Sequence, residues 1–392
     1  MKVVLSSIGK FHTFDMAREL LEHDALMRIY TGYPEFKLKS ENIKKSLIHT
    51  YPYLHAPYMK FPFWDFVGNK VKQEWEYWDK VLFDRHVAKN IPDCDLFSGL
   101  SGSGFKTGQL VKARGGIYIC DRGSSHIRVQ NNILEEEHER WGLPYQAIDP
   151  RIIEREENEY ALADAITVPS SFVYRSFVAC GVSPEKLKLI PYGVNLIKFE
   201  KVGHPMPGQF NVLFVGGGSL RKGVADLLVA YSMLVHSKKS LTLVGEFSPI
   251  FVKWLRGLNL LTNDVKILGH LPQTELKHLM SRSHVMVLAS VEEGLAMVQA
   301  QAMACGCPVI ATQNTGAEDL FHDGEEGFIV AIRQPKAIAE KMQYLADHPD
   351  VREDMSTRAL AKVCAIGGWT SYGNKTFSIM KSLYTHKKTG TN

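Results

Sequence analysis

The stretch NVLFVGGGSLRKGVADLLVAY, residues 211–231, joins a strand pattern, a glycine-rich turn and a helix pattern in one unit. The apolar run ends in three glycines, two basic residues follow at Arg221 and Lys222, and a helical pattern opens near Gly223. Glycine lets a backbone approach a ligand closely, and a helix amino terminus offers unpaired N–H groups that attract anions. The stretch therefore predicts one βα unit of a parallel sheet with an anion-binding turn.

Two better-known phosphate-binding patterns do not fit this turn. A dinucleotide fingerprint would need a glycine where Arg221 stands, and a Walker motif would need Ser or Thr after Lys222. A tight turn with two solvated bases stays open as the alternative interpretation.

A second informative stretch, VMVLASVEEGLAMVQAQAMACGCPVIAT, spans residues 285–312. Its pattern predicts a strand ending near Ser290, a helix beginning at about Gly294 and a further strand from Pro308. In such a helix Glu293 and Gln301 would lie roughly 12 Å apart along the axis and contact opposite ends of an extended ligand. The alternative is that Glu293 is an acid favoured by the helix dipole and that Gln301 is simply solvated.

Apolar runs alternate with helical patterns along most of the chain, which is typical of βαβ units. The Pro- and Gly-rich segment EKVGHPMPGQ, residues 200–209, interrupts this alternation before a new unit begins at Asn211. We therefore expect two Rossmann-like, doubly wound domains that face a central cleft. The eight Glu residues between positions 135 and 159 are expected on solvated helix faces.

The composition is that of an ordinary globular protein. The 392 residues are 45% hydrophobic and 22% charged, with a formal net charge of +4. No apolar run spans a bilayer, the first residues lack a signal-peptide core, and the six cysteines are dispersed, so we expect a cytoplasmic protein. The Cys305 and Cys307 pair lacks a second ligand pair at zinc spacing, so no metal site is expected.

Several motifs in order resemble the retaining glycosyltransferases of family 4. They are the 211–231 unit, EEGLAMVQAQAMACGCPVIAT at 292–312, NTGAEDLFHDGEEGFIV at 314–330 and, upstream, ADAITVPSSFVYRSFVACGVSPEKLKLIPYGVNLIKF at 163–199. The resemblance covers about residues 155–345. It implies a GT-B architecture with an N-terminal acceptor-side domain (1–195), a C-terminal nucleotide-sugar-binding domain (196–365) and a final helix that crosses back to the first domain, followed by a basic tail (366–392).

The resemblance also implies a function and a set of site residues. The chain would transfer a sugar from a nucleoside-diphosphate sugar to a hydroxyl acceptor, without a cofactor or metal. UDP is the expected nucleotide, and the pathway would be glycan, polysaccharide or glycolipid biosynthesis. Glu293 would contact the sugar, and the donor would be bound by Gly217, Gly218, Arg221, Lys222, His270, Leu271, Gly294, Leu295, Ala296 and Gln301. The sequence departs from the family at Gln301, where a Glu is usual, and at Gly217, where an Arg is usual.

The N-terminal half supplies the other candidates. Asp121 and His126 follow a predicted strand, and we expect them to line the reaction centre and orient hydroxyl groups; a structural Asp and a surface His are the alternative. The segment SSIGKFHTF, residues 6–14, resembles the flexible first loop of such enzymes, in which Gly9 would let the backbone approach the phosphates, with His12 a weaker candidate. Asp93 and Asp95 spell D-x-D but are expected to form a turn before a strand rather than a metal site.

Two further possibilities stay open. Residues 36–64 interleave Lys37, Lys39, Lys44, Lys45 and Lys60 with aromatic residues, which suits peripheral contact with an anionic membrane. A nucleotide-sugar epimerase or hydrolase on the same fold, or a non-catalytic glycosyltransferase-like subunit, are the alternative functions. No nucleic-acid partner is expected.

Overall fold

The protein, seen in a computed structural model that describes residues 1–61 and 67–389, contains two parallel sheets. The first sheet has seven strands in the order β3-β2-β1-β4-β5-β6-β7. Its strands are β1 (Val3–Ser7), β2 (Leu26–Thr31), β3 (Ile48–Thr50), β4 (Leu96–Leu100), β5 (Ile117–Asp121), β6 (Ala165–Val168) and β7 (Leu187–Leu189).

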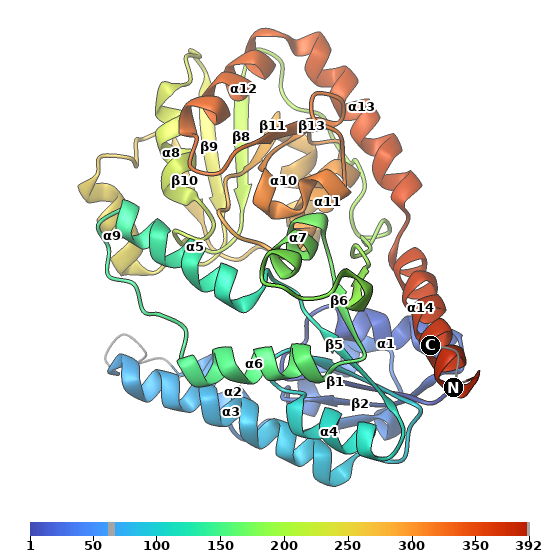
Figure 1. The fold of residues 1–392 in the computed structure, drawn as a ribbon. Helices are drawn as coiled ribbons and strands as arrows, with labels where there is room; N and C mark the ends of the chain where they lie inside the picture. The colour runs from blue at the N-terminus through green and yellow to red at the C-terminus, as the bar shows by residue number, and fades with distance from the viewer. Residues whose placement is uncertain (62–66, 390–392) are drawn as a thin grey trace.

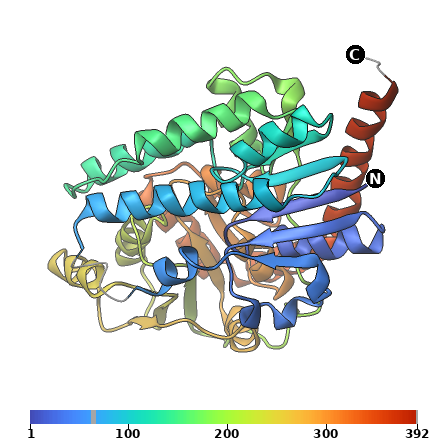
Figure 2. The ribbon, with the colours of Figure 1, turned by 90° about the horizontal axis from the view of Figure 1, so that it is seen from below.

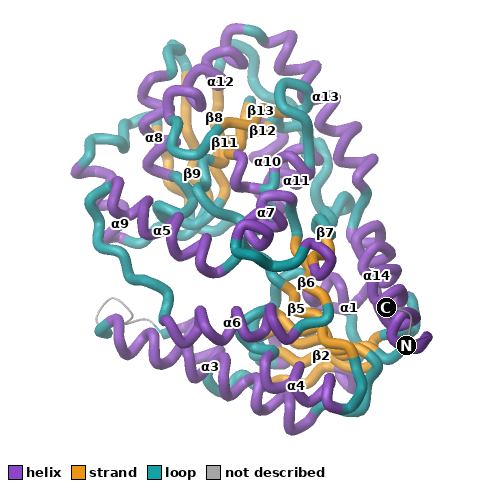
Figure 3. The backbone as a smooth tube through the Cα atoms, viewed as in Figure 1, coloured by secondary structure: helices purple, strands orange, loops and turns teal. Residues whose placement is uncertain are grey.

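The second sheet has six strands in the order β10-β9-β8-β11-β12-β13. Its strands are β8 (Phe210–Val215), β9 (Lys239–Val244), β10 (Val265–Leu268), β11 (Val285–Leu288), β12 (Val309–Thr312) and β13 (Gly327–Val330). In both sheets the strand order reverses beside the first strand, as in doubly wound folds. The expectation of two Rossmann-like, doubly wound domains is thereby confirmed (Figures 1 and 3).

Helices cover both sheets (Figure 1). Those of the first half are α1 (Thr13–Glu22), α2 (His55–Lys60), α3 (Asn69–Asn90), α4 (Phe105–Ala113), α5 (Ile127–Arg140), α6 (Pro150–Leu162) and α7 (Ser171–Ala179). Those of the second half are α8 (Val224–Met233), α9 (Pro249–Gly257), α10 (Gln273–Arg282), α11 (Met297–Ala304), α12 (Pro335–Asp347), α13 (Pro349–Ile366) and α14 (Trp369–Thr389). No helix in these described ranges has the length and apolarity that a bilayer crossing requires.

The first sheet is buried on both faces, which explains its nearly continuous apolar strands. Successive side chains of a strand point to opposite faces. In β5, Ile117 and Ile119 join the cluster formed with α1 and α14, whereas Tyr118 and Cys120 join the cluster formed with α3, α4 and α6. Burial on both sides leaves the loops at the strand ends as the accessible parts of the sheet.

The two halves are joined where the chain crosses between them twice. A Cβ on Gly193, in the first crossing, would lie 2.6 Å from the carbonyl oxygen of Gly368, in the second. After the second crossing, α14 lies against α1 on the first half, as Figure 2 shows from below. The two crossings therefore pass in direct backbone contact.

Helix α5 belongs to the first half of the sequence but packs on the second. The Nε atom of Arg333 lies 2.8 Å from a carboxylate oxygen of Glu137, and Arg140 is paired with Asp226. The rings of Trp141 and Trp254 meet edge to face at 5.6 Å. The helix lies beside α9 in Figure 1, so it forms part of the contact between the halves.

The expectation of solvated faces is wrong for three of the eight Glu residues between 135 and 159. Glu137, Glu156 and Glu159 are buried, because each accepts hydrogen bonds from arginine side chains or backbone amides. A charged group tolerates burial only when it is paired in this way. Helical periodicity alone did not reveal these partners, since they lie on other elements.

Candidate active site

The predicted anion-binding residues lie at the point of the second sheet where the strand order reverses. β8 and β11 are neighbours there, and their carboxyl ends carry Arg221, Lys222 and Glu293. The Lys222 ammonium forms an ion pair with Glu293, and a terminal nitrogen of Arg221 lies 4.0 Å from the same carboxylate. The structure therefore brings these three side chains together, at the edge where open α/β sheets bind ligands.

Gly223 holds the two loops together. Its φ is +64°, and a Cβ at this position would lie 1.9 Å from the carbonyl oxygen of Ala289, at the end of β11. The amide of Val291 also donates a hydrogen bond of 2.9 Å to the carbonyl oxygen of Arg221. Only glycine allows this approach, which sets the position of Arg221 relative to the β11 loop.

The helix after this loop starts later than predicted. α11 begins at Met297 rather than at about Gly294. The amides of Glu293 and Ala296 donate to the carbonyl oxygens of Asn314 and Thr315, at 3.0 and 3.1 Å, so these residues are held as a loop. The predicted separation of Glu293 and Gln301 along one helix axis is therefore wrong.

Glu292, next to the predicted Glu293, connects the two halves of the protein. It is fully buried and accepts hydrogen bonds from the amide and hydroxyl of Ser125, at 2.9 and 2.8 Å, and from Gln130 at 3.2 Å. The Arg221 Nε lies 2.9 Å from its other oxygen. Burial alone would raise the pKa of Glu292, but Arg221 and these hydrogen bonds outweigh burial and lower it. Glu292 is thus a buried carboxylate that fixes Arg221.

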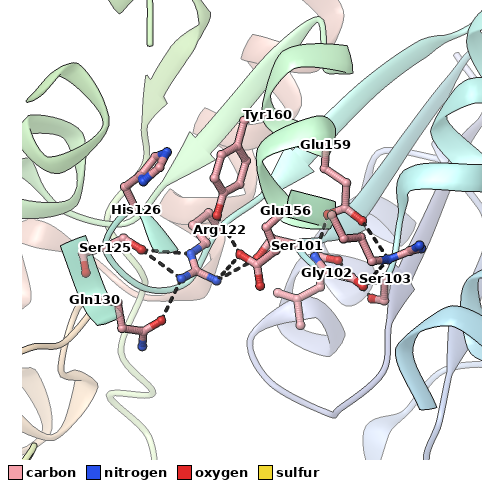
Figure 4. A network of polar contacts seen from close by, with 12 residues as sticks. Ser101, Gly102, Ser103, Arg122, Ser125, His126, Gln130, Glu156, Glu159 and Tyr160 are labelled. Atoms are coloured by element: carbon pink, nitrogen blue, oxygen red, sulfur yellow. Dashed lines mark hydrogen bonds and ion pairs between the residues drawn. The ribbon is translucent and has the colours of Figure 1, made fainter. Parts of the chain in front are cut away.

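Arg122 continues this network into the first half (Figure 4). Its guanidinium donates to Glu156 at 2.6 Å, to Ser101 at 3.1 Å, to Gln130 at 2.9 Å and to the carbonyl oxygen of Ser125 at 2.9 Å. Burial alone would lower the pKa of Arg122, but Glu156, Glu292 and other neighbouring groups together outweigh burial and raise it. A continuous set of polar contacts therefore links α6 to the candidate donor site.

A cavity of about 380 Å³ lies beside this network, at the carboxyl ends of β1 and β4. It is lined by His12, Ser101, Arg122 and Gly123 from the first half and by Met297 from α11. The cavity is therefore shared by both halves and adjoins the loop that carries Glu293.

Asp121 acts on this cavity through another side chain. It is buried, and its oxygens contact the His12 Nε2 and the Thr167 hydroxyl, both at 2.7 Å. His12 lines the cavity, whereas Asp121 is not among its lining residues. The ring of His12 also packs on Tyr192, in the crossing between the halves, with centroids 4.3 Å apart. His12, the weaker candidate from the sequence, is the group exposed to the cavity.

His126 lies elsewhere. It caps α5 by accepting a hydrogen bond from the amide of Arg128, and its ring packs against Tyr160 and Phe177. It lines a separate cavity with Cys180. The expectation that His126 shares a reaction centre with Asp121 is not met by this placement, because the cap turns its ring into the core.

The buried position of His126 predicts a pH-dependent stability. Burial lowers the pKa of His126 to about 4, from the ordinary value near 6.5 of an unfolded chain. Between these values only the unfolded state binds the proton, so stability present above pH 6.5 is lost as pH falls toward 4. Replacing His126 by Asn, which keeps a capping oxygen, should reduce the loss of unfolding free energy between pH 7.5 and 5 by about 1–2 kcal/mol, measured by urea denaturation.

The control for this prediction is His204→Asn, at an exposed position. It should leave the pH dependence as in the wild type. An identical pH dependence in the His126→Asn variant would contradict the prediction.

Of the remaining predicted donor residues, Gly9 follows β1 of the first sheet and the others follow strands of the second sheet. Gly217 is open, with its nearest neighbour 3.7 Å from a hypothetical Cβ, whereas Gly218 is covered by the ring of Phe247. His270 and Leu271 follow β10, two strands from β8. Their role in donor binding stays a prediction, as do those of Gly9, Gly294, Leu295, Ala296 and Gln301.

Sequence reasoning missed Glu292, Arg122 and Glu156 as members of the site. Glu292 directly precedes Glu293, and Arg122 directly follows Asp121. Both neighbours were candidates from the sequence, so a position close to a strand end was an available signal. The partners of Glu292 and Arg122 are 167 and 34 residues away along the chain, and no local pattern reports such pairs.

Comparison with known proteins finds a family model and relatives similar to part of this chain. Residues 198–362 match the family model of glycosyl transferases group 1. The chain is 29% identical over 205 residues to a D-inositol 3-phosphate glycosyltransferase of Pseudarthrobacter chlorophenolicus, covering 48% of this chain and 49% of that protein. It is 26% identical over 180 residues to a glycogen synthase of Mycobacterium tuberculosis, covering 45% and 43%. The chain thus matches about half the length of these curated relatives.

Solved structures resemble the whole chain. Sucrose-phosphate synthase from Thermosynechococcus elongatus has a TM-score of 0.72 at 19% identity, covering 98% of this chain and 99% of that one. Anabaena HepE in complex with UDP and glucose has a TM-score of 0.70 at 16% identity, covering 97% and 100%. The chain therefore has the GT-B fold, and its residues 198–362 are similar to the group 1 glycosyl transferases.

Proposed function

We propose that this protein is a retaining glycosyltransferase of family 4 that transfers a sugar from a nucleoside-diphosphate sugar, with UDP as the nucleotide, to a hydroxyl acceptor. The observation that carries the proposal is the convergence of Arg221, Lys222 and Glu293 at the edge of the second sheet. The match of residues 198–362 to glycosyl transferases group 1 supports it. The UDP bound by HepE supports the choice of nucleotide.

The cations of this site suit a diphosphate. Glu292 engages the Arg221 Nε, which leaves the terminal nitrogens of the guanidinium for phosphate oxygens. Lys222 is about a quarter exposed and pairs with Glu293 in this structure. On donor binding we expect Lys222 to turn to the phosphates and Glu293 to accept a hydrogen bond from a sugar hydroxyl.

The proposed reaction breaks the bond between the anomeric carbon and the phosphate oxygen. Its electron pair leaves with the nucleoside diphosphate, where Arg221 and Lys222 neutralise the developing charge without a metal or cofactor. The acceptor oxygen bonds to the anomeric carbon on the same face, and its proton passes to the departing phosphate. His12, positioned by Asp121, borders the cavity from which the acceptor would approach. A role in glycan, polysaccharide or glycolipid biosynthesis is part of the proposal.

Calorimetry with UDP, UMP and uridine tests donor binding directly. We expect UDP to bind at least about tenfold more tightly than uridine, because charge-assisted contacts to the diphosphate dominate the site. Replacing Arg221 by Ala should remove most of this difference. Lys253→Ala, on the exposed side of α9, is the control and should bind UDP as the wild type does.

A chain that binds none of these nucleotides would refute the proposed donor site. If UDP binds, incubation of candidate UDP-sugars with and without a hydroxyl acceptor separates a transferase from an epimerase or hydrolase. Product that forms equally well without an acceptor would favour those alternatives.

A further inference from the structure

A second cavity of about 540 Å³ lies at the carboxyl ends of β2 and β3. Its wall consists mainly of apolar and aromatic side chains from the loops after these strands and from α2, among them Phe36, Tyr53 and Met59. This volume lies within the range of about 300–1,000 Å³ found for small-molecule sites. The cavity is separate from the donor site and takes part in none of the contacts described there.

The cavity adjoins the reaction cleft through one shared piece of backbone. Gly32 lines the apolar cavity, and Ile8 lines the cavity of about 380 Å³ that both halves share. The amide of Gly32 donates a hydrogen bond of 3.1 Å to the carbonyl oxygen of Ile8. A Cβ on Gly32 would lie 2.6 Å from that oxygen. A molecule held in the apolar cavity therefore lies next to the place where an acceptor hydroxyl would react.

The side chains around the opening leave apolar surface in water. Phe36, Tyr53 and Met59 are 66%, 74% and 58% exposed. Large apolar side chains gathered in this way mark binding surfaces on soluble domains. Covering them would remove apolar area from water, which favours binding of a flexible apolar chain.

The rim of the cavity is positively charged. Lys37 and Lys60 are exposed, and within residues 1–61 and 67–389 neither forms an ion pair. Of the acidic groups near the cavity, Glu35 is paired with Lys45 and Asp79 with His55 at 2.9 Å, and Glu76 accepts a hydrogen bond from the Tyr58 hydroxyl. The net charge at the opening therefore favours an anionic ligand.

We infer that this cavity binds the apolar chain of an amphiphilic acceptor whose phosphate pairs with Lys37 and Lys60 and whose hydroxyl-bearing group enters the cleft. The inference rests on the proposed glycosyltransferase function and gives it an acceptor class: a hydroxyl compound carried on a phosphate-bearing apolar chain. A small soluble acceptor would use neither the apolar wall nor the basic rim.

The test measures the binding of alkyl phosphates by calorimetry, below their micelle-forming concentrations. Affinity should be negligible for methyl phosphate and should rise about two- to fourfold per methylene from hexyl to decyl phosphate. Octyl glucoside, with the same chain and no charge, should bind several-fold more weakly than octyl phosphate. Equal affinity for methyl and decyl phosphate would overturn the inference.

Variants locate the binding. Phe36→Ser and Met59→Ser change exposed side chains and should each weaken decyl phosphate binding at least about fivefold. Lys37→Ala with Lys60→Ala should remove the preference for octyl phosphate over octyl glucoside. The matched controls, Val235→Ser and Lys238→Ala, are exposed positions at the amino ends of the second sheet and should change neither quantity.

Two further measurements distinguish an acceptor cavity from a membrane-contact face and from the donor site. In the first, the protein is floated with phosphatidylcholine vesicles that contain phosphatidylglycerol. If it floats with them but binds no monomeric alkyl phosphate, this face contacts a membrane and the inference is overturned. UDP titration of the same variants should give the wild-type affinity. If the wild type binds decyl phosphate but no UDP, the proposed function fails while the amphiphile site stands.

Discussion

Turnover by the Lys222→Ala variant is expected to fall about 100-fold or more below that of the wild type. The ammonium of Lys222 lies beside Glu293 at the carboxyl edge of β8 and β11, where the leaving diphosphate would gain negative charge. Preorganised cations at such a position are typically worth factors of about 100 to 1,000 in rate. The measurement is the initial rate of UDP release from the preferred sugar donor with a saturating acceptor.

Controls separate a chemical effect from unfolding. Lys222 is partly exposed and Lys222→Ala leaves Glu293 close to Arg221, so thermal unfolding should be little changed. Lys253→Ala should keep the wild-type rate, and Lys222→Arg should keep more activity than Lys222→Ala, since it retains the charge. A rate for Lys222→Ala within about threefold of the wild type would show that the assignment of this residue is wrong.

The Arg122→Ala variant is expected to lose about 3–5 kcal/mol of unfolding free energy. Arg122 is buried and makes hydrogen bonds to Glu156, Ser101, Gln130 and the backbone of Ser125. Among the described residues, its removal leaves the buried Glu156 carboxylate with no cation at ion-pair distance and with the hydroxyl of Tyr160 as its remaining hydrogen-bond donor. Urea denaturation followed by circular dichroism measures the change.

A neighbouring arginine provides the comparison. Arg128, also in the first half, pairs with Glu157, but its side chain is 58% exposed. Exposed ion pairs contribute about 0–1 kcal/mol, so Arg128→Ala should be nearly neutral. The double variant Arg122→Met/Glu156→Leu should recover part of the lost stability, because no unpaired charge remains. Equal losses in Arg122→Ala and Arg128→Ala would contradict the importance given to burial.

The fold was predictable where strands are central and apolar. The run NVLFVG at 211–216 and the strand expected from Pro308 correspond to β8 and β12, each starting within one residue of its predicted start. The sequence did not predict β3 and β7, because these strands have three residues each and lie at the edges of the first sheet. β2, LMRIYT, carries the polar Arg28, whose guanidinium donates a hydrogen bond to the carbonyl oxygen of Asn90, outside the strand. Short or mixed strands depend on tertiary pairing that no local pattern contains.

The candidate site was predictable for a topological reason. Loops after adjacent strands at the reversal of strand order must meet, so identifying the two loops was enough to bring Lys222 and Glu293 together. The start of α11 was not predictable, because hydrogen bonds to Asn314 and Thr315 hold the preceding residues out of the helix. Asp121 was placed correctly at a strand end, but its contact with His12 spans 109 residues.

The docking of α5 means that the boundary of the two domains in space differs from any single cut in the sequence. A fragment that begins after residue 195 would lack α5 and Trp141. Asp226 would lose its partner Arg140, and Arg333 would lose its partner Glu137. The ring of Trp254 would lose its contact with Trp141. Such a fragment would have lost part of its own surface layer. Expression of the donor-binding half by itself would therefore call for α5 to be supplied as a separate peptide or by circular permutation.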